Sequence, residues 1–173
     1  IIDSMRPVIL QCKKENNPDY GRNISRLYCI TIYMALLQGI GFTVFAKMIV
    51  KILYGKEYLA SIPVLRILVW YIAFSYMGTV RNIWILAEGK QQFLWKINLA
   101  GALANIALNA CLIPVWGASG AAVASLMTQF FTNFVFGFLY KPLRENNRQL
   151  LKGFNPGLLL ELLRNYRQRT TKE

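Results

Sequence analysis

The stretch VLRILVWYIAFSYMGTVRNIWILAEG, Val64–Gly89, decides the fold and raises a question about two of its residues. It is one long apolar run, and a helix rising roughly 1.5 Å per residue over this length would cross about 30 Å of hydrocarbon. It nevertheless contains Arg66 and Arg81, whose charges would each cost several kcal/mol at the middle of a bilayer. On a helix they lie roughly 22 Å apart and about 60° apart around the axis, so each falls near one membrane surface. We interpret them either as anchors that reach water at the interface or as cations lining a wet internal cavity.

Three further runs resemble this one in length and composition. The chain has 173 residues, of which 55% are hydrophobic, a share that is unusual for a soluble domain. The pattern predicts an all-α integral membrane protein with four transmembrane helices, at residues 27–50, 62–87, 93–115 and 118–140. Between the last two, in IPVWGASG, Pro114 is expected to stop one helix and Gly117 to turn the chain into a tight antiparallel hairpin.

The basic residues alternate from loop to loop. The net charge of +12 would suit a nucleic-acid ligand, but its distribution suits a membrane surface better, so no nucleic-acid partner is expected. Lys and Arg gather in three places: before the first span (Arg6, Lys13, Lys14, Arg22, Arg26), in the middle loop (Lys90, Lys96) and in the tail (Lys141, Arg144, Arg148, Lys152, Arg164, Arg167, Arg169, Lys172). The positive-inside rule therefore places both ends and the loop from Glu88 to Lys96 in the cytoplasm.

The flanks of the four spans are polar. We expect residues 1–26 to hold the end of a preceding helix and a cytoplasmic loop, and the chain to be a piece of a longer protein. Residues 141–173 are expected to form a basic cytoplasmic tail with a short amphipathic helix, capped by Asn155 with Pro156 in its first turn. Two interpretations of this helix stay open: it lies at the membrane surface, or it docks a partner.

The inventory of reactive side chains argues against catalysis. The chain has no histidine, and its cysteines, Cys12, Cys29 and Cys111, show no paired spacing. No zinc site, disulfide framework or Cys-His apparatus can be assembled from these residues, so no metal, cofactor or enzymatic activity is expected. Every acidic residue lies in a loop or at an end, and no predicted span carries a carboxylate that could relay protons.

Polar stripes run along three of the spans. Asn98, Asn105 and Asn109 recur at about two turns and one turn, which places them on one face of the third span. Gln129 on the fourth span and Gln38 on the first are further amide side chains inside predicted spans. Lipid would not tolerate such a stripe, so it faces protein or water. It either holds helices together or lines a lumen that hydrogen-bonds sugar hydroxyls.

The segments LYGKEYLASIPVLRIL and LAEGKQQFLWKINLAGALANIALNACLIPVWGASGAAVASL resemble the C-terminal part of bacterial O-antigen and polysaccharide flippases. These belong to the multidrug/oligosaccharidyl-lipid/polysaccharide (MOP) exporter superfamily. The shared features are a YG-x-EY turn before a proline-led span, an EGK loop, an asparagine-bearing helix ending in IP-x-x-G, and the small-residue GASGAA opening of the next span. They cover roughly residues 53–140.

The resemblance implies a MATE-like protein of about twelve helices in two bundles in the bacterial inner membrane. It implies flipping of an undecaprenyl-pyrophosphate-linked oligosaccharide by alternating access, among membrane lipids and beside a polysaccharide polymerase or chain-length machinery. The candidate cavity residues are Arg66, Arg81, Asn98, Asn105, Asn109, Gln38 and Gln129. The alternatives are a multidrug or other lipid-linked-substrate exporter of the same superfamily, and a structural membrane fragment that transports nothing.

Overall fold

The computed structural model describes residues 2–170, apart from the side chains at 165, 166, 169 and 170. Residues 171–173 of the predicted tail, Lys172 among them, lie outside the described residues. Within 2–170 the chain forms helices and short connections and contains no strand. In this range three helical segments are long and apolar enough to cross a membrane, Tyr20–Leu53, Lys56–Ala87 and Gln92–Leu139. The all-helical class is therefore confirmed, and these three segments are consistent with a membrane protein.

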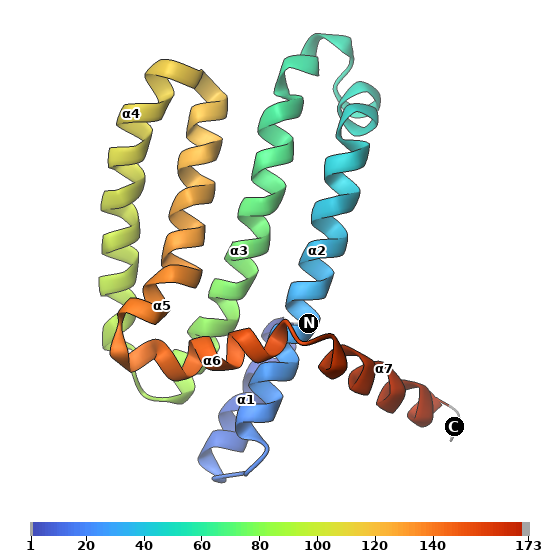
Figure 1. Ribbon diagram of the computed structural model, residues 1–173, viewed down its shortest axis with the longest axis vertical. Helices are drawn as coiled ribbons and strands as arrows, with labels where there is room; N and C mark the ends of the chain where they lie inside the picture. The colour runs from blue at the N-terminus through green and yellow to red at the C-terminus, as the bar shows by residue number, and fades with distance from the viewer. Residues whose placement is uncertain (1, 171–173) are drawn as a thin grey trace.

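The third of these segments is folded back on itself. Helix α4 (Gln92–Phe130) contains one non-helical residue, Gly117, with φ 54° and ψ −131°. A positive φ is easy only for glycine, and the chain reverses direction here into two antiparallel arms (Figure 1). The expected stop at Pro114 is wrong, because the first arm continues through it. The proline removes one backbone hydrogen bond, that of its own nitrogen to the carbonyl four residues earlier, and Gly117 ends the arm three residues later.

The two arms approach each other closely beside this turn. A Cβ atom on Gly120 would lie 2.2 Å from the backbone oxygen of Leu112. No side chain larger than hydrogen fits there, so the small residues after Gly117 serve the contact between the arms.

Helix α2 (Tyr20–Leu53) begins earlier than the predicted span at residue 27. It follows α1 (Ile2–Lys14) after a short turn. Ile24, Leu27 and Tyr28 are almost fully buried at helical spacing, and their packing outweighs the weak helix propensity of the polar residues around them. Part of the expected loop is therefore helical, and only residues 15–19 connect α1 with α2. Helix α3 (Ile62–Ala87), preceded by the 3-10 turn η1 (Lys56–Ser61), covers the same residues as the second predicted span.

The chain after α4 continues as a series of short helical segments. A π-helical turn, η2 (Phe131–Val135), leads through α5 (Phe136–Leu139) and η3 (Lys141–Leu143) to α6 (Arg144–Gly153). Helix α6 docks on α2, where the buried Tyr28 hydroxyl donates to Asn146 Oδ1 at 2.9 Å. The sequence predicts one helix in this segment, and α6 is an additional one, whose buried face is mostly polar (Asn146, Asn147 and Gln149, with Leu150 and Gly153). Helix α7 (Pro156–Thr170) follows, and its first turn is capped as predicted, with the Gly157 N–H donating to Asn155 Oδ1 at 2.8 Å.

The basic segments meet at one end of the bundle. Helix α1, the α3–α4 connection, α6 and α7 lie together at the lower end of Figure 1, whereas η1 and the Gly117 turn lie at the opposite end. Lys13 pairs with Glu88 at 2.7 Å, and the Lys90 ammonium donates to the Pro142 carbonyl at 3.4 Å. The main hydrophobic core, centred on Trp84 and Tyr28, also lies at this end.

Away from this end the long helices expose apolar side chains. Leu37, Ile106 and Val115 are 76%, 67% and 71% exposed. Such a surface is unfavourable in water at roughly 25 cal/mol per Å² of apolar area. Lipid tails or further helices are the surroundings in which these faces are stable.

Candidate functional site

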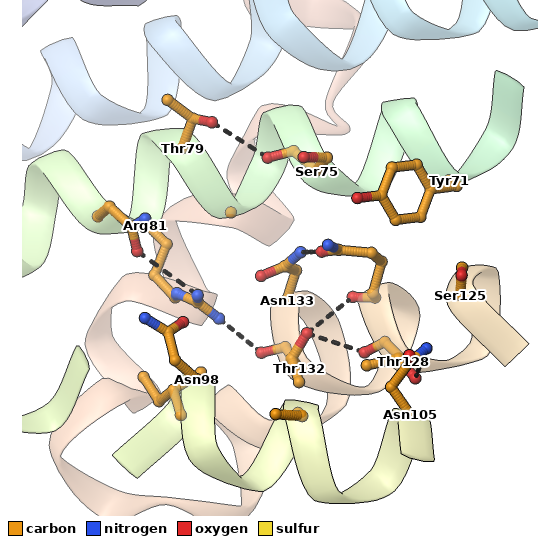
Figure 2. Close-up of a pocket in the computed structure, with 16 residues that line it drawn as sticks. Tyr71, Ser75, Thr79, Arg81, Asn98, Asn105, Ser125, Thr128, Thr132 and Asn133 are labelled. Atoms are coloured by element: carbon orange, nitrogen blue, oxygen red, sulfur yellow. Dashed lines mark hydrogen bonds between the residues drawn. The ribbon is translucent and has the colours of Figure 1, made fainter. Parts of the chain in front are cut away.

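A polar cavity of about 430 Å³ lies between α3 and the two arms of the α4 hairpin (Figure 2). One wall comes from α3, the second from the first arm and the third from the second arm with η2. Hydroxyl, amide and guanidinium groups dominate the lining, which is formed by Tyr71, Ser75, Gly78, Thr79, Arg81, Asn82, Ile97, Asn98, Gly101, Ala102, Asn105, Ser125, Thr128, Gln129, Thr132 and Asn133. No carboxylate is among these residues.

Arg81 provides the only cationic side chain of this lining. It is 4% exposed, and its Nη1 donates to the Thr132 carbonyl at 2.6 Å. Its Nη2 makes a long contact of 3.5 Å with Asn82 Oδ1, and its Nε has no protein partner. A buried charge is stabilised when an opposite charge and hydrogen bonds surround it. Arg81 has only neutral oxygens as acceptors, so the cavity favours an anionic guest.

The acceptor for Arg81 comes from the π-helical turn. The Phe136 N–H donates to the Phe131 carbonyl, five residues back, and passes over the Thr132 carbonyl that an α-helix would use. The Thr132 carbonyl then receives Arg81. A second carbonyl in the same turn, that of Phe134, accepts the Asn147 side-chain amide at 2.8 Å. The π-turn therefore presents backbone oxygens to side chains, as such turns often do at functional sites.

Amide side chains form another part of the polar lining and also join neighbouring helices. The Asn105 amide donates to Thr128 Oγ1 at 3.2 Å, from one arm to the other. The Asn133 amide donates to the Phe74 carbonyl at 3.1 Å and also bonds the Gln129 side chain. Two glycines admit these contacts. A Cβ on Gly78 would lie 2.6 Å from Asn133 Oδ1, and one on Gly101 would lie 2.9 Å from Thr132 Cγ2.

The structure brings together four of the seven candidate residues. Arg81, Asn98, Asn105 and Gln129 line the cavity. Asn109 does not line it but donates to Asn105 Oδ1 at 2.8 Å, one turn away.

Arg66 and Gln38 lie elsewhere. Arg66 is exposed, and its Nε donates to the Thr43 carbonyl of α2 at 3.2 Å. Gln38 is on α2, which contributes no residue to the lining. The two arginines of the opening stretch thus have different surroundings: Arg81 fits the cavity interpretation and Arg66 the anchor interpretation.

Sequence reasoning missed the wall formed by α3. Tyr71, Ser75, Thr79 and Asn82 line the cavity at intervals of one turn. The spacing rule that selected the asparagines of α4 also predicts this stripe, because its members recur at intervals of three or four residues. The same spacing rule applies to Asn133, which follows Gln129 by one turn.

Together the fold and the cavity define a helical protein with membrane-span-like segments and a polar internal pocket. Over 129 residues the chain is 25% identical to the capsular polysaccharide biosynthesis protein CapF of Staphylococcus aureus, an alignment that covers 75% of this chain and 33% of CapF. The chain thus spans about a third of the length of this curated relative. No family model and no solved structure matches the chain.

Proposed function

We propose that this chain forms the C-terminal part of a polysaccharide flippase of the MOP superfamily. The protein would be a transporter and not an enzyme. Its cargo would be an undecaprenyl-pyrophosphate-linked oligosaccharide, moved from the inner to the outer leaflet of the bacterial plasma membrane. The observation that carries the proposal is the polar cavity with a buried arginine and no carboxylate. The similarity to a capsular polysaccharide biosynthesis protein supports the polysaccharide context.

The proposal includes a membrane arrangement. The two arms of the α4 hairpin each cross the bilayer, which gives four spans with α2 and α3. Both ends of the chain lie in the cytoplasm, as the clustering of basic segments at one end of the bundle favours. The four spans belong to a larger MATE-like protein of two bundles, which rock against each other in alternating access.

The chemistry of the cavity suits such a cargo. A pyrophosphate cannot enter hydrocarbon without heavy desolvation, which a buried guanidinium offsets because its fork of donors matches phosphate oxygens. Sugar hydroxyls need both donors and acceptors, which Asn98, Asn105 and Gln129 provide. Polysaccharide polymerase or chain-length machinery would then receive the flipped cargo at the outer leaflet.

One observation favours a structural role as the second candidate. The bonds from Asn105 to Thr128 and from Asn133 to the Phe74 carbonyl join neighbouring helices. If the polar groups only hold the bundle together, their replacement lowers the amount of folded protein and leaves transport per molecule unchanged.

Complementation of a flippase-deficient bacterium tests the proposal. The whole protein would be expressed as wild type, Arg81→Gln, Arg81→Lys and the matched control Arg66→Gln, and surface polysaccharide would be measured per molecule of membrane-inserted protein. We expect Arg81→Gln to reduce export at least tenfold, since it removes the charge, and Arg81→Lys to reduce it less. Arg66→Gln should stay within about twofold of wild type. Wild-type export by Arg81→Gln would refute the assignment of this cavity to the cargo.

A further inference from the structure

Helix α7 has one face that packs against the rest of the chain and one face that is largely exposed. Leu158, Leu159, Glu161 and Leu162 are partly buried, whereas Leu160 and Leu163 are 66% and 57% exposed. The exposed leucines border a shallow groove together with Gly157, Glu161, Arg164 and Arg167. At one-turn spacing, this outward face of α7 combines apolar side chains with guanidinium groups.

Glu161 also borders this groove and is the only carboxylate side chain in residues 156–170. Its carboxylate pairs with the Arg26 guanidinium of α2 at 2.8 Å, which neutralises its charge. The charges that accompany Leu160 and Leu163 in the groove are therefore basic on balance.

Contacts with α2 fix the position of α7 along the axis of α2. Tyr33 donates its hydroxyl hydrogen to the Phe154 carbonyl at 3.3 Å, just before α7 begins. Arg26 meets Glu161 two turns further along α7. Arg26 directly precedes the apolar part of α2, where a spanning helix emerges from hydrocarbon. The exposed leucines thus lie near the membrane interface, and α7 extends sideways from α2 above the first turns of that helix (Figure 1).

We propose that the outward face of α7 binds the surface of an anionic lipid bilayer. Leu160 and Leu163 enter the boundary between headgroups and acyl chains, and Arg164 reaches phosphate groups while its stem stays in the apolar layer. The negative surface potential of the cytoplasmic leaflet matches the net basic charge of this face, on which the single carboxylate, Glu161, is paired with Arg26. The ion pair between Arg26 and Glu161 fixes the direction in which the helix leaves the bundle.

Depth-dependent fluorescence quenching tests this proposal. Cys12, Cys29 and Cys111 would be replaced by alanine in the whole protein, and an environment-sensitive fluorophore would be attached at Leu163→Cys or at the control position Glu15→Cys in the α1–α2 turn. The protein would be reconstituted in phosphatidylcholine vesicles with or without roughly a quarter of phosphatidylglycerol. Lipids with a quencher high on the acyl chain should quench the label at position 163 several-fold more than the label at position 15.

Two further results decide between possible occupants of this face. In an Arg164→Gln background, the extra quenching produced by phosphatidylglycerol should fall by at least half. A label at position 163 that emits as in water overturns the proposal. A label shielded from water yet unreached by lipid quenchers overturns it as well, because a protein segment then covers α7. Neither readout depends on transport, so failure here is distinguishable from failure of the flippase proposal.

Discussion

Because Gly78 has no side chain, the Asn133 side chain of the π-turn can pack directly against α3. A Cβ at this position would lie 2.6 Å from Asn133 Oδ1, so Gly78→Ala forces Asn133 away from the Phe74 carbonyl that it bonds. We expect a loss of stability of roughly 1–3 kcal/mol, the usual cost of overpacking. Gly41→Ala is the matched control, because nothing lies within 4 Å of its added methyl group and alanine favours a helix by about 0.5–1 kcal/mol. Thermal unfolding in detergent should show a lower midpoint for Gly78→Ala only.

The sequence predicted individual site residues only in part. Spacing alone placed Asn98, Asn105 and Gln129 on inward stripes, and all three line the cavity. Spacing could not distinguish the roles of Arg66 and Arg81, because each lies near one end of the same helix. Their tertiary contacts distinguish them. Arg81 donates to the Thr132 carbonyl of the π-turn, whereas Arg66 donates to an exposed carbonyl of α2.

At the scale of elements, the π-turn η2 depends on a side chain from α6. Asn147 is 1% exposed, and its amide donates to the Phe134 carbonyl. Asn147→Leu leaves that carbonyl without its side-chain donor, which we expect to cost roughly 1–3 kcal/mol. Arg148→Leu, the same change at the exposed neighbouring position, should cost little. Equal unfolding midpoints for the two variants would contradict this role of α6.

The attachment of α7 to α2 should weaken in acid. The hydrogen bond from Arg26 lowers the pKa of Glu161 below its ordinary value. A lowered pKa in the docked state means that the contribution is fully present above the ordinary glutamate pKa of about 4.3 and is lost as pH falls through the lowered value. Fluorescence energy transfer between labels on α2 and α7 should therefore decrease below about pH 4. Glu161→Gln should show weaker docking that does not change over this range.

The elements themselves differ in how far the sequence determines them. Helix α3 was predictable to the residue, since a proline-led apolar run and an EGK turn delimit it. Helix α6 was not, because its buried face includes Asn146, Asn147 and Gln149. Asn146 Oδ1 bonds the Tyr28 hydroxyl and the Asn147 amide bonds the Phe134 carbonyl, whereas Asn146 Nδ2 and Gln149 Oε1 have no protein partner among the described residues. Burial that depends on tertiary contacts of this kind cannot be predicted from the spacing of residues along the chain.

At the scale of the whole molecule, the α4 hairpin determines how often the chain crosses the membrane. A crossing of both arms places the Gly117 turn and η1 outside the cell, with the α3–α4 connection and α6 inside. Single cysteines at Ala118, Lys56, Gln91 and Arg148, in a background without native cysteines, would report this with a membrane-impermeant maleimide. We expect labelling of Ala118→Cys and Lys56→Cys in intact cells, and labelling of the other two only after permeabilisation.

A hairpin that enters the bilayer and returns to the same side would have the same backbone as a hairpin whose two arms both cross. The labelling experiment distinguishes these two arrangements. The turn of a hairpin that returns would face the cytoplasm or lie in hydrocarbon, and Ala118→Cys would stay unlabelled in intact cells while Lys56→Cys reacted. The cavity would in that case open to one side of the membrane only, since two of its three walls belong to the hairpin. Alternating access requires walls that extend to both surfaces. Labelling of Ala118→Cys from outside is therefore a necessary condition for the proposed flipping, whichever cargo the cavity accepts.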